Sequence, residues 1–127
     1  MSVQRYAAEG GMTFSKSVVI DGQGTWIYLS GQVGLGDDGK VVPGGVEAET
    51  LKTFEHLIAA VAEAGGTVSD IVRVTGYLTS LDDYAGYSAA RKKVFGDTLP
   101  ASTAVQVAGL LLGAQVEIDA VAFVPHR

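Results

Sequence analysis

The chain has 127 residues, of which 14 are acidic and 9 basic, giving a net charge of −5, and 47% of its residues are hydrophobic. This length and balance predict one globular domain and exclude a disordered chain. Phosphate binding needs clustered cations, so the acidic balance argues against nucleic acid as the main partner, and the absence of cysteine excludes disulfides, thiolate catalysis and zinc ribbons.

The first third of the chain predicts a β-hairpin followed by a long loop. Residues 14–20 and 25–30 are rich in β-branched and aromatic side chains, and a turn-forming segment, residues 21–24, separates them. Residues 31–45 are rich in glycine, which is typical of a loop.

The remaining segments predict two helices that alternate with strands. Residues 46–64 carry an apolar stripe at helical spacing (Leu51, Phe54, Ile58 and Val61, with Leu57 on its edge), and Gly65-Gly66 can end that helix. Residues 71–78 predict a strand, and a second helix, capped by Asp82, runs to about Phe95. Residues 102–107 and 115–124 predict two further strands, around a connection over residues 109–113.

This order, ββαβαββ, predicts an α+β domain with two helices on one face of a mixed five-stranded sheet. By the period-2 rule Val121 and Phe123 share the other face with Glu117 and Asp119. A face that is both apolar and uncovered predicts burial against another subunit.

Metal and membrane sites have no support in the sequence. His56 and His126 are far apart and fit no metal-ligand spacing, so we expect neither metal nor cofactor. The N-terminal residues lack an apolar signal region, and no apolar run approaches the ~18 residues that cross a bilayer. We expect one cytoplasmic domain over residues 1–127 that does not bind membranes.

Six motifs resemble those of the RidA/YjgF family, the reactive enamine/imine intermediate deaminases, and the resemblance spans roughly residues 12–124, nearly the whole chain. They are YLSGQ at residues 28–32, GG at 44–45, AGG at 64–66, VTGYLTSLDDY at 74–84, PASTAV at 100–105 and GAQVEIDAVA at 113–122.

The resemblance implies a chorismate-mutase-like fold and a homotrimer with clefts between neighbouring subunits. It also implies a small-molecule ligand, a reactive nitrogen metabolite such as an imine or enamine derived from an amino acid. In such a cleft water adds to the C=N carbon and ammonia leaves, while an arginine holds the substrate carboxylate and a glutamate positions the water.

The family's site residues carry over only in part. Glu117 matches the active-site glutamate, which makes it the candidate catalytic residue, and Ser30 and Gly31 match the family's strand motif. The carboxylate-binding arginine of the family's P-A-R-[ST] motif is replaced by Ser102, which precedes Thr103. The candidate substrate-binding residues are Phe14 (where the family has tyrosine), Ser30, Gly31, Ser102 and Thr103.

Other positions near this cleft also depart from the family. Gly109, followed by three leucines, stands where the family has a second arginine, and Ser88 and Arg91 stand where relatives often carry Asn and Tyr. Lys16 or Arg91 could bring a cation to the altered cleft, although an exposed, solvated cation is the simpler interpretation of each. We expect His56 to face water and assign it no role.

The loss of the arginine weakens the expected carboxylate binding. Exchanging a charged two-pronged contact for one neutral hydrogen bond costs about 2–4 kcal/mol, or roughly 30- to 1000-fold in binding or rate. We therefore expect hydrolysis of amino-acid imines at least about tenfold below that of an arginine-bearing relative, and partial restoration by Ser102→Arg.

Three functions remain open at this stage. The first is a Rid-type hydrolase with reduced or altered activity. The second is a non-catalytic ligand-binding or regulatory trimer that keeps the cleft. The third, an endoribonuclease-type activity, is disfavoured by the acidic balance and by the lack of a catalytic histidine and lysine arrangement.

Overall fold

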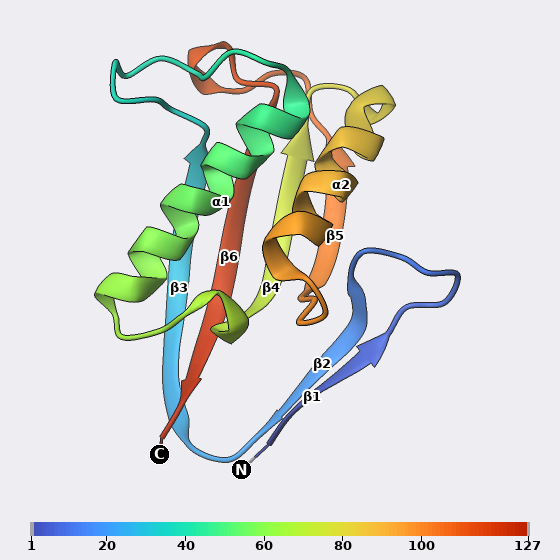
Figure 1. The fold of residues 1–127 in the computed structure, drawn as a ribbon, viewed down its shortest axis with the longest axis vertical. Coiled ribbons are helices and arrows are strands. Elements are labelled where there is room, and N and C mark those ends of the chain that lie inside the picture. Colours follow the sequence, from blue (N-terminus) through green and yellow to red (C-terminus); the bar gives the residue numbers. More distant parts are fainter. Residues whose placement is uncertain (1, 127) are drawn as a thin grey trace.

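A computed structural model describes residues 2–126 and places two helices on one face of a mixed sheet, as predicted (Figure 1). The helices are α1 (Val46–Glu63) and α2 (Tyr84–Phe95). The strands are β1 (Ser2–Ala7), β2 (Ser15–Asp21), β3 (Gly24–Val33), β4 (Ile71–Leu78), β5 (Ala101–Gln106) and β6 (Val116–Pro125).

The sheet has six strands in the order β1-β2-β5-β4-β6-β3, so the prediction of five strands is wrong. The missed strand is β1, which pairs antiparallel with β2 at the sheet's edge. Arg5 fastens β1 to the body of the domain by donating hydrogen bonds to the carbonyl oxygens of Leu99 (2.8 Å) and Ser69 (2.7 Å). The strand is short, and its only partly buried positions are Val3 and Arg5, so it carries little apolar signal and the sequence did not indicate it.

Between the edges, the sheet mixes parallel and antiparallel pairs. β4 and β5 run parallel on either side of the α2 crossover, whereas β6 is antiparallel to both β4 and β3. The β1–β2 hairpin diverges from the other strands (Figure 1), and its only register pair with β5 is Ser15 with Ala101.

Helix α1 buries its apolar stripe against β3 and β6. Phe54, Leu57 and Val61 are fully buried, so Leu57 lies at the centre of the stripe and not on its edge. The helix ends as predicted at the two glycines: Gly66 N–H donates to the Val61 carbonyl at 3.0 Å, and Gly65 has a φ of 88°.

Helix α2 begins at Tyr84, one residue later than the sequence suggested. A short 3-10 turn, Leu81–Asp83, precedes it, and Ser80 rather than Asp82 caps that turn by accepting the Asp82 N–H at 3.1 Å. The Phe95 ring at the end of α2 packs edge-on against Phe54 of α1, with ring centroids 5.1 Å apart, so the two helices share one core.

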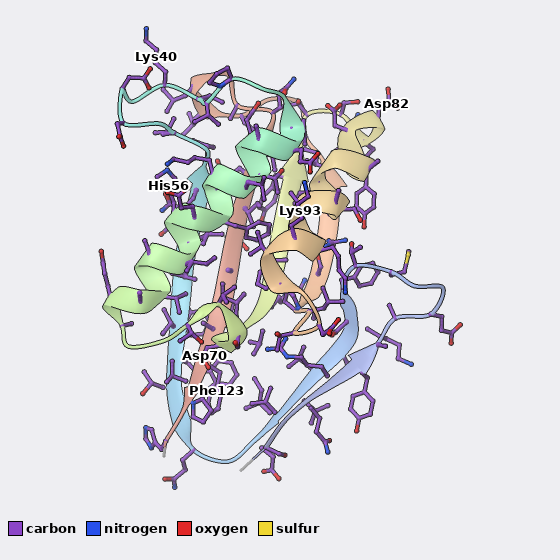
Figure 2. The ribbon with its side chains drawn as sticks, in the orientation of Figure 1. Lys40, His56, Asp70, Asp82, Lys93 and Phe123 are labelled. Carbon is purple, nitrogen blue, oxygen red and sulfur yellow. The ribbon has the colours of Figure 1, made fainter. Side chains whose placement is uncertain are left out.

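Phe123 does not lie on an uncovered surface, contrary to the prediction. It is 2% exposed, because the Trp26 ring packs on it at 4.9 Å and the chain passes close at Gly24. It lies near Asp70, with which it lines one hollow (Figure 2). Val121 on the same face is half-buried.

The sheet face away from the helices still exposes large apolar side chains. Tyr28 is 78% exposed, and Trp26 and Val105 are 48% and 39% exposed. None of the helices formed by residues 2–126 is both long and apolar enough to cross a membrane.

Candidate functional site

A bulge in β3 shapes one part of the site. Leu29 pairs with Ala120 and Gln32 with Ile118, so Ser30 and Gly31 together lie opposite a single residue of β6. The strand continues to Val33, so the predicted loop begins three residues later than expected. A bulge next to a potential site re-aims the backbone, and here it turns Gly31 toward Glu117.

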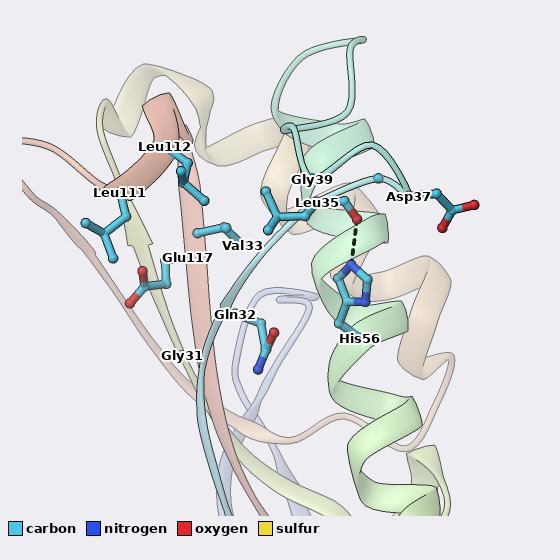
Figure 3. A pocket seen from close by; sticks show the side chains of 11 residues that line it. Gly31, Gln32, Val33, Leu35, Asp37, Gly39, His56, Leu111, Leu112 and Glu117 are labelled. Carbon is cyan, nitrogen blue, oxygen red and sulfur yellow. Dashed lines mark hydrogen bonds between the residues drawn. The ribbon is translucent and has the colours of Figure 1, made fainter.

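The carboxylate of Glu117 lies directly against Gly31. A Cβ atom added to Gly31 would come within 2.6 Å of Oε2 of Glu117, so only glycine leaves the carboxylate room in this position. Both residues line a hollow of about 340 Å³ between the end of β3 and the connection before β6 (Figure 3). This volume suits a small metabolite.

Two exposed leucines border the same hollow (Figure 3). Leu111 and Leu112 are 76% and 66% exposed, and Leu112 adopts φ 61° and ψ 21°, a left-handed conformation that is costly for a non-glycine residue. The sequence placed this leucine run near the site, and the structure places its last two members beside Glu117 in the lining of the hollow.

His56 also borders the hollow and does not simply face water. It is half-buried, and its Nε2 is 2.7 Å from the carbonyl oxygen of Leu35 in the loop after β3 (Figure 3). The contact ties that loop to α1. The apolar-stripe pattern could not show it, because the partner is a backbone atom of a distant segment.

Polar side chains continue along the helix-free face of the sheet. Tyr77 of β4 donates a hydrogen bond to Oδ2 of Asp119 at 3.0 Å, and this bond raises the pKa of Tyr77. On β5, Thr103 accepts a hydrogen bond from Nη2 of Arg73 at 3.0 Å and is exposed.

Ser102 lies on the opposite face of the sheet, beneath α2, where it contacts Arg91. The guanidinium of Arg91 donates from Nη1 to Oγ of Ser102 at 2.9 Å and from Nη2 to the hydroxyl of Tyr84 at 2.9 Å. Nη2 and Nε also donate to Oγ1 of Thr13, at 2.7 and 3.3 Å. Arg91 is 1% exposed, so the interpretation of this residue as a solvated cation is wrong; Lys16 is exposed, as expected.

Aromatic rings surround the same guanidinium. Its carbon lies 5.2 Å from the ring centre of Phe14, 5.7 Å from that of Tyr84 and 5.0 Å from that of Tyr87, which are cation–π distances. The Tyr87 hydroxyl is fully buried and has no hydrogen-bond partner among the described residues, and burial raises the pKa of Tyr87. Ser88 extends the cluster through a 2.7 Å hydrogen bond with Thr13.

Five of the six candidate residues fall into two groups, and Thr103 lies apart from both on the helix-free face. Glu117, Ser30 and Gly31 form the first group, at the hollow and the bulge. Ser102 and Phe14 belong to the Arg91 cluster beneath α2. One chain does not bring these groups together. Within residues 2–126, no three His, Asp or Glu side chains converge as metal ligands would.

Comparison with known proteins places these groups in context. The family model described as Endoribonuclease L-PSP matches residues 5–124. The chain belongs to the RidA/YjgF family. It is 37% identical over 110 residues to the mouse 2-iminobutanoate/2-iminopropanoate deaminase, covering 86% of this chain and 79% of that protein.

The chain is similar to further relatives in sequence and to solved structures in fold. A RutC family protein of Pyrococcus abyssi is 33% identical over 101 residues, which are 79% of this chain and 80% of its own. The crystal structure of RidA from an Antarctic Psychrobacter bacterium superposes with a TM-score of 0.73 at 30% identity, covering 98% of this chain and 99% of that one. The fold implied by the resemblance is thereby confirmed.

The sequence names Arg91 as a cation that could reach the altered cleft, but it does not predict the burial of Arg91 or its partners. The signal was present in the paired departures at Ser88 and Arg91, which lie one helical turn apart and therefore on one face of α2. The apolar pattern of α2 alone could not show that this face points at Ser102.

Proposed function

We propose that the chain is a cytoplasmic hydrolase of small imines or enamines, with activity toward amino-acid imines that is reduced or altered because Ser102 replaces the family's arginine. Family membership and the naming of a relative as a 2-iminobutanoate/2-iminopropanoate deaminase support the reaction class. The single observation that carries the proposal is the Glu117 carboxylate held against Gly31 in a hollow of metabolite size.

The chemistry requires one base and one water. Water adds to the carbon of the protonated C=N bond while Glu117 accepts a proton from it, which leaves a carbinolamine with a neutral amine. Glu117 then returns the proton to this nitrogen. The C–N bond breaks as the hydroxyl oxygen becomes the carbonyl oxygen, and the hydroxyl proton leaves with ammonia as ammonium. A carboxylate that moves one proton out and back in this way contributes roughly 10²- to 10⁴-fold.

A second copy of the chain completes the site in this proposal. Glu117 and Ser102 lie on opposite faces of one sheet, so one small molecule cannot contact both within a chain. The exposed Trp26, Tyr28 and Val105 supply an apolar face for subunit contact. A homotrimer would bring the Glu117 hollow of one subunit to the Arg91 cluster of the next.

The test is hydrolysis of imines that an amino-acid oxidase produces in the same assay. Wild type should accelerate release of the keto acid, and Glu117→Gln should lower kcat/KM by about 10²-fold or more, because the amide cannot accept the proton. Asp119→Asn is the matched control: it removes a carboxylate two residues away on the same face and should change kcat/KM by less than about threefold.

Two results would contradict the proposal. If Glu117→Gln hydrolyses imines as fast as wild type, Glu117 does not move the proton. If wild type binds ligands without accelerating hydrolysis of any imine or enamine, the chain is a ligand-binding or regulatory member of the family. The serine at position 102 favours this second candidate.

A further inference from the structure

We propose that the Arg91 cluster is a binding site for a small carboxylate, in which helix α2 supplies the guanidinium that the sequence lacks at position 102. The inference rests on the proposed function for the identity of the rest of the substrate. It adds Arg91 as the residue that binds the carboxylate of the substrate. It also predicts that Thr13 fills the carboxylate position when no ligand is bound.

The hydrogen-bonding groups of the cluster call for an acceptor. A guanidinium donates from every nitrogen and accepts nothing. All the side-chain groups that receive its hydrogen bonds are hydroxyls, which carry protons of their own to donate: Thr13, Tyr84 and Ser102. Donors therefore outnumber acceptors around Arg91, and a carboxylate, which only accepts, corrects the imbalance.

The orphaned hydroxyl of Tyr87 is an independent sign of a missing ligand. Tyr87 is fully buried, and its oxygen has no hydrogen-bond partner among the described residues although its ring lies 5.0 Å from the Arg91 guanidinium. Buried polar groups are almost always paired, so this hydroxyl points to an acceptor that the free chain does not contain.

The charge of Arg91 is also uncompensated. The ion pairs formed within residues 2–126 join Lys52 with Glu55, Lys92 with Asp97 and Lys93 with Glu47, and none includes Arg91. The aromatic faces and hydroxyls around Arg91 reduce the free-energy cost of burying its charge. A bound anion would reduce this cost further, because it would neutralise the charge. A planar guanidinium suits a carboxylate because the two can form paired hydrogen bonds.

Thr13 occupies the place where we expect the carboxylate to bind. Its hydroxyl accepts from both Nε and Nη2 of Arg91, which are the edge of the guanidinium that forks onto a carboxylate. Thr13 lies in the connection between β1 and β2, where Gly10 and Gly11 have φ of 78° and 69° and no close neighbours at their Cβ positions. The ligand would displace Thr13, and this competition would weaken carboxylate binding.

The test measures anion binding without turnover. Pyruvate, the keto acid that hydrolysis of 2-iminopropanoate yields, is titrated into the full chain by calorimetry, with neutral pyruvamide as the matched ligand. We expect pyruvate but not pyruvamide to bind wild type. Arg91→Met should weaken binding by about tenfold or more, and the control Lys92→Gln, which removes an exposed charge of the same helix, should leave it unchanged.

Thr13→Ala keeps the proposal falsifiable if Arg91→Met does not fold. Removing the competing hydroxyl should strengthen pyruvate binding about threefold or more, whereas a purely structural hydroxyl would give no gain. An unchanged or weaker affinity in Thr13→Ala overturns the proposal, as does wild-type affinity in folded Arg91→Met. Binding of pyruvate through Arg91 without imine hydrolysis would contradict the proposed function alone. Imine hydrolysis that is equally fast in wild type and Arg91→Met would contradict this inference alone.

Discussion

The Nη1 of Arg91 donates a hydrogen bond to Oγ of Ser102 at 2.9 Å, joining the middle of α2 to the start of β5. Both residues depart from the family pattern. Their contact couples the two positions, because the small residue on the strand leaves the space that the long cation of the helix occupies. The consequences for mutagenesis differ from those expected from either position alone.

The first prediction concerns Ser102→Arg, which the sequence alone expects to restore imine hydrolysis. A second guanidinium at this position would meet that of Arg91 in a buried site, and unpaired like charges there are strongly destabilising. We therefore expect Ser102→Arg alone to lower the unfolding midpoint in urea and to gain little activity. The double variant Ser102→Arg/Arg91→Tyr, which restores the family pattern at both positions, should recover stability and exceed the single variant in kcat/KM.

Arg91→Tyr alone is the control for this exchange. It should fall below wild type in kcat/KM, because it removes the one guanidinium of the cluster. If Ser102→Arg alone is as stable as wild type and faster, the two positions are independent, and the argument from their contact is wrong.

The second prediction compares Gly31, which lies beside Glu117 in the candidate site, with Gly34, which packs against the backbone of α1. In Gly31→Ala the new methyl group meets the flexible end of Glu117, at 2.6 Å from Oε2, so the carboxylate can move aside. In Gly34→Ala it meets the backbone oxygen of Glu49 at 2.6 Å, which cannot move without shifting α1. We expect Gly31→Ala to fold normally but lose at least about tenfold in kcat/KM, and Gly34→Ala to be destabilised by about 1–3 kcal/mol.

Urea unfolding and the imine assay distinguish the two glycine variants. The reverse outcome, a destabilised Gly31→Ala with normal catalysis per folded molecule, would show that Glu117 does not need its position against Gly31.

The third prediction is a trimer in solution. The face that carries Tyr28, Trp26 and Val105 is uncovered within the chain, and charging its most exposed member should oppose association. Light scattering should report three chains for wild type at micromolar concentration and smaller particles for Tyr28→Glu. Lys40→Glu, on the exposed loop after β3, is the control and should stay assembled. A wild-type monomer would contradict both the trimer and the completion of the site by a second copy.

Much of the fold could be predicted from the sequence because its signals are local. The stripe of Phe54 and Val61, the paired glycines after α1 and the β-branched run of β4 each act within a few residues. The strand β1 escaped detection because its position depends on Arg5, which binds carbonyl oxygens more than sixty residues away.

The site was less predictable, since it depends on contacts between distant segments. Glu117 and Gly31 were named from motifs, and the structure adds that they touch. The environment of Arg91 could not be predicted, because it is assembled from the β1–β2 connection, α2 and β5. A burial pattern along one helix does not show which strand residue is small enough to admit a long side chain.

The last prediction concerns the pH dependence of the Tyr77–Asp119 pair. The hydrogen bond to Asp119 raises the pKa of Tyr77, so the neutral phenol is favoured in the folded state. Its contribution to stability is complete below the unfolded pKa of about 10 and is lost as the pH rises through the higher folded pKa. Asp119→Asn removes the carboxylate that causes the shift, so ultraviolet titration should show one tyrosine ionising at lower pH than in wild type. Tyr77→Phe should remove that same ionisation from the wild-type curve. Identical titrations for wild type and Asp119→Asn would mean that the bond does not persist in solution.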